Sequence, residues 1–308
     1  MSEFSFRTMT CDDESEVAAL ICEGTNQWYQ AHAMQPIFES HAAARVFSEV
    51  YEALDPGCCV LAVEGDSNRI AGSCFYHPRE SHVSLGIMNV HPDFFGRGLA
   101  SRLLRFVTTL ADERQLPVRL VSSAMNLDSF SLYTRSGFVP RQAFQDMFLE
   151  VPNSGMLDLP AGSERVRDAT MTDLQGIVAL EKELVGIDRT QDFRFFIENA
   201  SGIWHVSVLE NAAGEIDGVL DSVNHPGSNM IGPGVFRDEK TALALILSEL
   251  NHHAGRRPVF LVPVDCRLLV SGLYSRGARN CEIHFSQVRG DYQVPTGIVM
   301  PTFMPETG

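Results

Sequence analysis

The stretch Val-His-Pro-Asp-Phe-Phe-Gly-Arg-Gly-Leu-Ala-Ser at residues 90–101 separates a predicted strand from a predicted helix. Residues 83–90 form a short segment with apolar side chains at alternating positions, and Pro92 prevents the strand from continuing. Leucine and valine then recur at helical spacing over residues 99–110. We therefore expect a strand over residues 83–90 and a helix that begins near Gly98.

The start of this helix is a predicted anion site. Its first N–H groups have no partner within the helix, and they carry the positive end of the helix dipole. Gly96 and Gly98 lack a Cβ, so the backbone between them can approach phosphate oxygens closely. A glycine pair before a helix also occurs in ordinary loops, so the pattern alone leaves both interpretations open. The Gly-Lys-Ser/Thr of a Walker loop and the Gly-x-Gly-x-x-Gly of a dinucleotide site are both missing, which disfavours those ligands.

The segment resembles the acyl-CoA pyrophosphate loop of the GNAT superfamily of N-acetyltransferases. The pattern of that loop is Val-x-Pro followed by Gln/Arg-x-x-Gly-x-Gly/Ala. Val90, Pro92, Gly98 and Ala100 fall on the pattern, while Phe95 stands where Gln or Arg is usual. This departure matters little if the backbone itself holds the phosphates.

A second GNAT signature follows at the right distance. Asn126 opens a short predicted helix, Tyr133 lies on it, and the Gly137-Phe138 pair ends it, with Gly137 suited to a left-handed cap. The two signatures together imply that the chain binds acetyl-CoA as co-substrate. The resemblance assigns cofactor binding to Met88, Val90, Phe95, Gly96, Arg97, Gly98, Leu99, Ala100, Ser101 and Asn126.

An internal repeat predicts two similar units. Arg7, Thr10 and Asp13 recur as Arg167, Thr170 and Asp173, always 160 residues later, and the apolar residues that follow recur with them. The turn-rich segment between the copies is the natural linker. We expect an α+β (α/β) fold of two tandem GNAT-like domains, each a mixed, mostly antiparallel sheet flanked by helices. The predicted boundaries are 1–150 for the acetyl-CoA-binding domain, 151–164 for the linker and 165–308 for a degenerate GNAT-like domain.

The second copy lacks the predicted anion site. The corresponding segment, residues 230–240, contains Pro233, which removes one donor. Asp238 and Glu239 place carboxylates near the helix start, where they suit the helix end better than a ligand would. Tyr274 holds the place of Tyr133, but without a preceding phosphate site a second acid is not expected there. The second copy would then shield the first site or shape the acceptor pocket.

The resemblance implies direct attack of an amine on the thioester carbonyl, with Tyr133 as the acid that protonates the departing thiolate. A phenol has an ordinary pKa of about 10 and is protonated at neutral pH. The base is open: the predicted strand holds no carboxylate, and His82 and His91 are either bases acting through water or, as we favour, surface residues.

Trp28, Tyr29 and His32 are expected either to line the acceptor pocket or to pack a helix onto the sheet, with packing slightly favoured. The acceptor is expected to be an amine of a small molecule or peptide. No metal site is expected.

Composition excludes some functions. The net charge of −15 argues against a nucleic-acid partner and weakly favours a cationic acceptor, although acidic surfaces are common. No apolar run is long enough to span a membrane, and the first residues do not form a secretion signal. Seven cysteines without a Cys-x-x-Cys pair fit free thiols in the cytoplasm. The chain is expected to be a monomer or homodimer, and a non-catalytic acyl-CoA-binding regulatory module remains the alternative to an enzyme.

Overall fold

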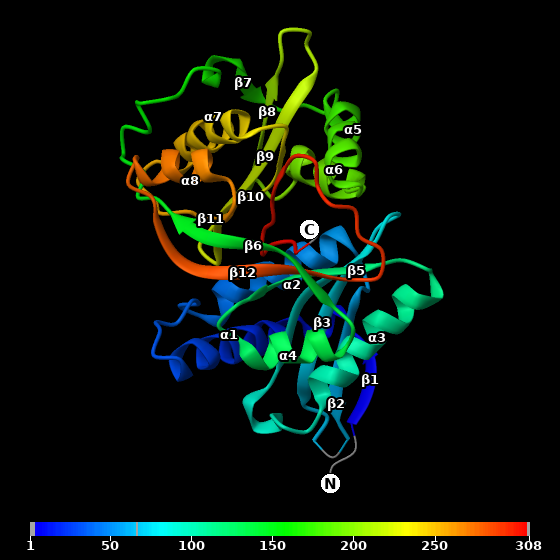
Figure 1. The fold of residues 1–308 in the computed structure, drawn as a ribbon. Coiled ribbons are helices and arrows are strands. Elements are labelled where there is room, and N and C mark those ends of the chain that lie inside the picture. The colour runs from blue at the N-terminus through cyan, green and yellow to red at the C-terminus, as the bar shows by residue number, and fades with distance from the viewer. Residues whose placement is uncertain (1–3, 66, 307–308) are drawn as a thin grey trace. The chain divides into compact units, whose positions relative to one another are not determined.

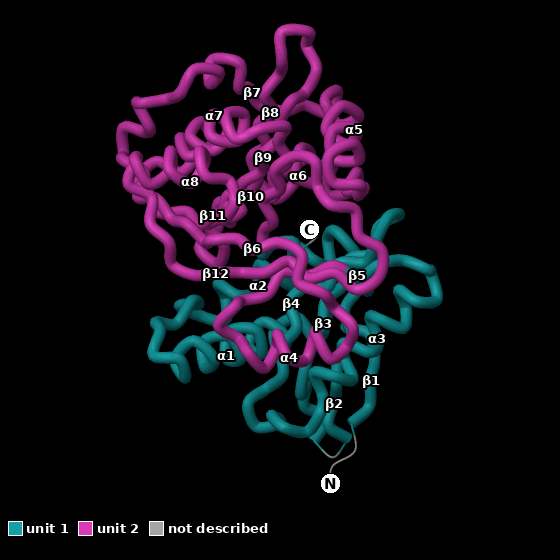
Figure 2. The backbone as a smooth tube through the Cα atoms, viewed as in Figure 1, with its two compact units in different colours: residues 1–118, 303–307 teal, residues 119–302, 308 magenta. Residues whose placement is uncertain are grey.

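A computed structural model describes residues 4–65 and 67–306 and divides the chain into two compact units (Figure 2). Unit 1 comprises residues 1–118 together with 303–307, and unit 2 comprises residues 119–302. Of the described residues, the segment 303–306 thus joins the unit built by the start of the chain. The domain boundaries expected above remain a prediction.

Unit 1 is an antiparallel sheet with helices on both faces (Figure 1). The strands lie in the order β1-β2-β3-β4, and β4 coincides with the strand predicted from the alternation. The elements of this unit are β1 (Phe4–Thr8), α1 (Glu14–Ala31), α2 (His41–Leu54), β2 (Cys59–Glu64), β3 (Ile70–Pro78), β4 (Val83–Val90) and α3 (Leu99–Glu113).

The two faces of β3 show how this sheet is covered. Successive side chains of a strand point to opposite faces. Phe75 and His77 contact the ring of Tyr51 from α2, at centroid distances of 4.9 and 4.8 Å. Tyr76 contacts Phe106 of α3 at 5.9 Å. The α1–α2 pair therefore covers one face of the sheet and α3 covers the other.

Unit 2 contains a longer, mostly antiparallel sheet in the order β5-β12-β6-β11-β10-β9-β8-β7. Strand β6 lies between β12 and β11 and is antiparallel to both, while β11 is parallel to β10. Its elements are β5 (Val118–Ser123), α4 (Leu127–Arg135), β6 (Val139–Phe148), β7 (Val166–Asp168), α5 (Leu174–Val185), α6 (Thr190–Glu198), β8 (Trp204–Glu210), β9 (Ile216–His225), β10 (Ser228–Phe236), α7 (Glu239–Glu249), β11 (Val259–Pro263), α8 (Arg267–Tyr274), β12 (Arg279–Arg289) and β13 (Ile298–Met300).

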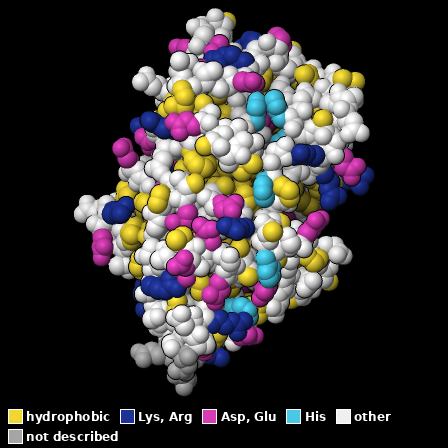
Figure 3. All heavy atoms as spheres, turned by 180° about the vertical axis from the view of Figure 1, so that it is seen from behind, with side chains coloured by type: hydrophobic (Ala, Val, Ile, Leu, Met, Phe, Trp, Pro, Cys, Tyr) yellow, Lys and Arg dark blue, Asp and Glu magenta, His cyan; other side chains and the backbone are white. Residues whose placement is uncertain are grey.

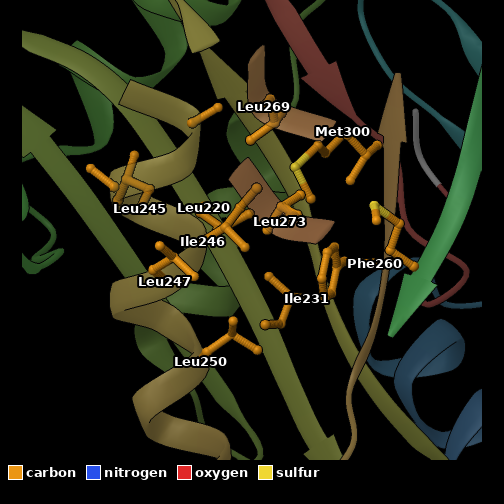
Figure 4. Close-up of a cluster of buried hydrophobic side chains, with 14 of the residues drawn as sticks. Leu220, Ile231, Leu245, Ile246, Leu247, Leu250, Phe260, Leu269, Leu273 and Met300 are labelled. Carbon is orange, nitrogen blue, oxygen red and sulfur yellow. The ribbon is translucent and has the colours of Figure 1, made fainter. Parts of the chain in front are cut away.

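The core of unit 2 lies between α7, α8 and the strands beneath them (Figure 4). Ile246 of α7 and Leu250, the residue after that helix, lie on the side of Ile231 of β10 and Phe260 of β11, and all four are fully buried. Burial of each such side chain contributes about 1.5–3 kcal/mol relative to exposure. This packing holds α7 against the strands that precede and follow it.

The repeat seen in the sequence is confirmed in three dimensions. Arg7 donates to both carboxylate oxygens of Asp13 at 2.6 and 2.7 Å, and Arg167 does the same to Asp173 at 2.8 and 2.7 Å. Each aspartate also accepts from the threonine that opens its turn. The expected fold class, two tandem α+β domains with mostly antiparallel sheets, is therefore confirmed.

Candidate active site

The connection from β4 to α3 has the backbone of an anion site. After β4 ends at Val90, residues 92–94 form a short 3₁₀ turn, and Gly96 and Gly98 both adopt a φ of +75°. This left-handed conformation is one that glycine adopts without steric cost. Helix α3 then begins at Leu99, which confirms the predicted start near Gly98.

The first turn of α3 presents free N–H groups. Gly98 is the N-cap and has no side chain to accept from them, and the first backbone bond of the helix is from Arg102 to the Gly98 carbonyl at 3.2 Å. The N–H groups of Leu99, Ala100 and Ser101 therefore have no acceptor within the helix. A Cβ built on Gly96 or Gly98 meets nothing within 4 Å, so the space beside the two glycines that precede the helix is open. The arrangement can bind a phosphate group.

The side chains of the loop are mostly exposed. Phe95 is 56% exposed, and the guanidinium of Arg97 lies 5.2 Å from the ring centre of Phe94. Arg102, in contrast, turns back toward β1, where it lies over Phe6 and donates to the Phe4 carbonyl at 3.3 Å. Of these two arginines, Arg97 is the one whose side chain stays with the loop.

The burial of strand β4 decreases along its length. A β-bulge places Gly86 and Ile87 opposite the single residue Phe75 of β3. The strand is buried up to the bulge, whereas Ile87 to Val90, including the predicted Met88, are only half-buried. The half of β4 next to the loop is thus the part that a ligand can reach.

Buried polar side chains gather on the α1–α2 face of β3 and β4. Ser73 pairs with Asn89 and His77 pairs with Ser84, and the alternation places all four on the face that carries Phe75. Ser73 Oγ, His77 Nε2, Ser84 Oγ and Asn89 Oδ1 are buried without a hydrogen-bond partner among the described residues. Buried polar atoms are rarely left unpaired. This face therefore has the polarity expected where water or a polar substrate binds.

His77 is held by an acid on its other side. Its Nδ1 lies 2.6 Å from Asp55 Oδ2, and Asp55 also accepts two bonds from Arg79, at 2.8 and 3.0 Å. Burial raises the pKa of Asp55, but His77 and Arg79 oppose it and the net pKa is lowered. Sequence reasoning missed this group, whose only signal was a histidine and an arginine at the end of an apolar strand.

The two histidines considered as bases lie just before and just after β4, and a role as base stays untested for both. His82 is fully buried, which corrects the expectation of a surface residue, because it lies in the turn between β3 and the buried start of β4; its Nδ1 is 2.8 Å from Ser81 Oγ. His91 is half-buried, and its Nε2 lies 2.7 Å from the guanidinium of Arg69.

Trp28, Tyr29 and His32 lie at the end of α1. The rings of Trp28 and His32 stack at 4.2 Å, and Tyr29 contacts Trp28 edge-on at 5.1 Å. Trp28 and Tyr29 are half-buried and His32 is exposed. They form an aromatic cluster at the surface of unit 1, and their role in an acceptor pocket remains a prediction.

The second signature lies in unit 2. The Asn126 side chain caps α4 by accepting from the Ser129 N–H at 3.0 Å. Tyr133 is 8% exposed and contacts the ring of Phe138 at 5.8 Å. Helix α4 ends at Arg135, and Gly137 has a φ of +89°, which confirms the predicted left-handed position.

The corresponding helix start in the second copy is closed by its own acid. Asp238 is the N-cap of α7, and its Oδ1 accepts from the N–H groups of Lys240 and Thr241 at 3.0 and 2.8 Å. Glu239 accepts from the Leu269 N–H at 2.7 Å. Pro233, expected near the helix start, lies instead within β10. The hydroxyl of Tyr274 donates to Gln145 at 2.9 Å.

Two groups of side chains bring metal-ligand atoms together in unit 2. Within each group the ligand atoms lie within 4.8 Å of one another; the groups are Asp168, His205 and His252, and Asp146, Glu282 and His284. Both groups are hydrogen-bonded internally, with His205 3.2 Å from Asp168 and His284 2.9 Å from Asp146. The expectation of no metal site therefore stays a prediction.

Surface charge, helix hydropathy and cysteine pairing are relevant to possible partners. Acidic and basic side chains are interspersed on the face drawn in Figure 3. Among the described residues, no helix combines the length and apolar character needed to cross a bilayer. All seven cysteines are free.

Comparison with known proteins supports the same fold. Residues 25–138 match the model of the acetyltransferase (GNAT) family. Among solved structures, a putative acetyltransferase from Pyrococcus horikoshii is 15% identical, with a TM-score of 0.74 over 98% of this chain and 95% of that one. A GCN5-related N-acetyltransferase from Sphaerobacter thermophilus is 18% identical, with a TM-score of 0.65 over 95% and 98%. A tandem GNAT protein from the clavulanic acid biosynthesis pathway is 15% identical, with a TM-score of 0.58 over 94% and 100%. No curated protein matches the chain by sequence.

Proposed function

Because residues 25–138 carry a GNAT acetyltransferase domain within a tandem GNAT fold, we propose that the chain is an N-acetyltransferase. It would transfer an acetyl group from acetyl-CoA to an amine of a small molecule or a peptide N-terminus. The observation that carries the proposal is the first turn of α3, which has no side-chain cap and follows two left-handed glycines with open space beside them. Such a helix start binds the negative charge of a pyrophosphate.

Each part of the co-substrate would meet a different part of the chain. The pyrophosphate would lie against Gly96 to Ser101, with Phe95 and Arg97 at the rim. The pantetheine amides would pair with the backbone of β4 at Met88 and Val90, the half-buried end of the strand. Asn126 fixes the start of α4, on which Tyr133 would protonate the departing thiolate. Trp28, Tyr29 and His32 would contact the acceptor.

The reaction would be a direct transfer. The amine nitrogen attacks the thioester carbonyl carbon, the C–S bond breaks, and the thiolate takes a proton to leave as CoA. An N–H group of β4 would polarise the carbonyl in the transition state. The free cysteines support a reducing compartment such as the cytoplasm.

The test combines binding and turnover on the full chain. Isothermal titration with acetyl-CoA should give one site per chain. A thiol-release assay over a panel of primary amines and peptides with free N-termini should then find an acceptor that is turned over. Tight binding of acetyl-CoA without turnover of any amine would favour the regulatory module, and no binding at all would reject both functions.

A further inference from the structure

The carboxylate of Glu306 lies beside α2 in unit 1, far along the chain from the residues it contacts. The Tyr51 hydroxyl lies 3.4 Å from Glu306 Oε2 and 3.2 Å from the Phe303 carbonyl oxygen. Residues 303–307 belong to unit 1, so these contacts lie within one compact unit (Figure 2). A segment from the end of the described chain therefore supplies an acid to the unit that carries the anion loop.

Tyr51, which contacts this acid, also contacts the strand opposite the bulge of β4. The Tyr51 ring contacts Phe75 and His77 on β3, and Phe75 is the residue opposite the Gly86–Ile87 bulge. The space at the bulge is tight, because a Cβ on Gly86 would lie 2.9 Å from His77 Nε2. Glu306 thus bonds to a tyrosine on the α1–α2 face of the sheet, and the backbone of Ile87, where β4 becomes half-buried, bonds to the same tyrosine.

This face also carries the unpaired buried atoms described above. Ser73, His77, Ser84 and Asn89 each leave a polar atom without a partner among the described residues. Such atoms are suited to hold a water molecule or the polar groups of an acceptor. Glu306 is linked to this group through Tyr51, whose hydroxyl contacts the carboxylate and whose ring contacts His77.

The burial of Glu306 favours proton exchange near neutral pH. Burial raises the pKa of Glu306 to about 8, and the hydrogen bond from Tyr51 opposes the rise. Burial also raises the pKa of Tyr51 and of Cys74 from β3, and the charge of Glu306 adds to both shifts. His77, on the ring side of Tyr51, is held by Asp55, which Arg79 also contacts. A base is most effective when its pKa lies near the working pH.

We propose that Glu306 is the general base of the acetyl transfer, with Tyr51 as the residue that positions it. This inference rests on the proposed function. The carboxylate accepts a proton from the ammonium form of the acceptor, directly or through one water molecule. The freed lone pair forms the C–N bond as the C–S bond breaks, the second proton that the nitrogen then loses balances the one gained by the thiolate, and Glu306 returns its own proton to solvent. The proposal fills the role for which β4 itself offers no carboxylate.

The main test compares Glu306→Gln with Glu49→Gln, which removes an exposed carboxylate from α2, using acetyl-CoA and the best acceptor of the amine panel. Glu306→Gln should lower kcat/KM at pH 7 about 100-fold. Its acetyl-CoA affinity should be unchanged, because the anion loop is intact. The wild-type rate should rise through pH 8 and this limb should vanish in the variant. Glu49→Gln should behave as wild type.

Tyr51→Phe provides a second variant that keeps the carboxylate. Because the Tyr51 bond lowers the pKa of Glu306, its loss should move the rising limb to higher pH. Glu306→Gln activity within threefold of wild type, or an unmoved limb in Tyr51→Phe, would overturn the role of Glu306 while leaving the acetyltransferase proposal standing. Absence of turnover in the wild-type chain would overturn both.

Discussion

Helices α3 and α7 follow the same strand of their repeats, yet their first turns are used differently. Residues 91–98 join β4 to α3, whereas only residues 237–238 join β10 to α7. Gly98 has no side chain to offer, while Asp238 accepts from two N–H groups of α7. A helix start needs an anion or a hydrogen-bond acceptor, and only the second copy supplies its own. The first turn of α3 has no acceptor among the described residues of its own chain, whereas the corresponding turn of α7 has one. This difference between the two copies therefore points to a ligand at α3.

The edges of β10 and β4, the corresponding strands of the two copies, also differ. In unit 2, β11 pairs with β10 only at Met230 and Ile231, and β13 pairs with the remaining edge at Gly234 to Phe236. Strand β13 thus covers the edge of β10 that follows the bulge between Ile231 and Gly234. The matching end of β4, from Ile87 to Val90, is half-buried. In a GNAT domain the helix start and the strand edge would bind acyl-CoA. In the second copy Asp238 occupies the helix start and β13 occupies the strand edge.

The two tyrosines in corresponding helices should differ most. Tyr133→Phe should lower kcat at pH 7 about 100-fold, because the leaving thiolate loses its acid. Tyr274→Phe should leave kcat unchanged, since this tyrosine is 46% exposed and bonded to Gln145. Thiol-release kinetics with saturating acetyl-CoA provide the measurement. Equal losses in the two variants would reject the assignment of chemistry to the first copy.

An acid in the first turn of α3 should make it resemble α7. Ala100→Glu should weaken acetyl-CoA binding about 10-fold, or about 1.4 kcal/mol, because a carboxylate would repel the pyrophosphate. The isosteric neutral variant Ala100→Gln is the control. Isothermal titration at two salt concentrations measures the effect, which should shrink as salt rises. Equal affinities of the two variants would show that the phosphates bind elsewhere.

Removal of the cap from α7 should affect stability but not binding. Asp238→Ala should lower the free energy of unfolding by about 1 kcal/mol, whereas Asp238→Asn, which keeps an acceptor, should lose much less. Acetyl-CoA stoichiometry should stay at one, because β13 still covers the edge of β10. Urea unfolding and titration report the two quantities. A second site in Asp238→Ala would mean that the cap alone closes the second copy.

The smallest expected effect concerns a feature that the two copies share. Hydrogen bonds from Arg7 and Arg167 lower the pKa of Asp13 and of Asp173 to about 2. Each bond stabilises the fold above the unfolded pKa of about 4 and is lost as the pH falls toward 2. Asp13→Asn and Asp173→Asn should each cost less than about 1 kcal/mol at pH 7, with no difference from wild type near pH 2. Urea unfolding between pH 2 and pH 7 measures these differences in the free energy of unfolding. Asp173→Asn should lose less stability than Asp13→Asn, because Arg167 also contacts Glu210.

Local pattern was sufficient for much of the candidate site. The alternation over residues 83–90, the glycines at 96 and 98, and the apolar spacing beyond them predicted β4 and the start of α3, because these are formed by contacts between near neighbours in the chain. The acid at Asp238 likewise predicted the closed start of α7, whereas Glu239 accepts instead from the Leu269 N–H in the first turn of α8.

Contacts between distant segments could only come from the tertiary structure. Glu306 meets Tyr51 across 255 residues, β13 covers β10, and β6 lies between β12 and β11. His82 was expected at the surface and is buried, because burial depends on what packs against a segment.

The sequence by itself therefore determined the repeat, the first-turn chemistry of both helices and the family resemblance, since each depends on residues a few positions apart. Only the tertiary structure decided which strand edge is covered and which carboxylate meets Tyr51. Those outcomes depend on how the sheet brings together segments whose separation in the chain leaves no periodic pattern.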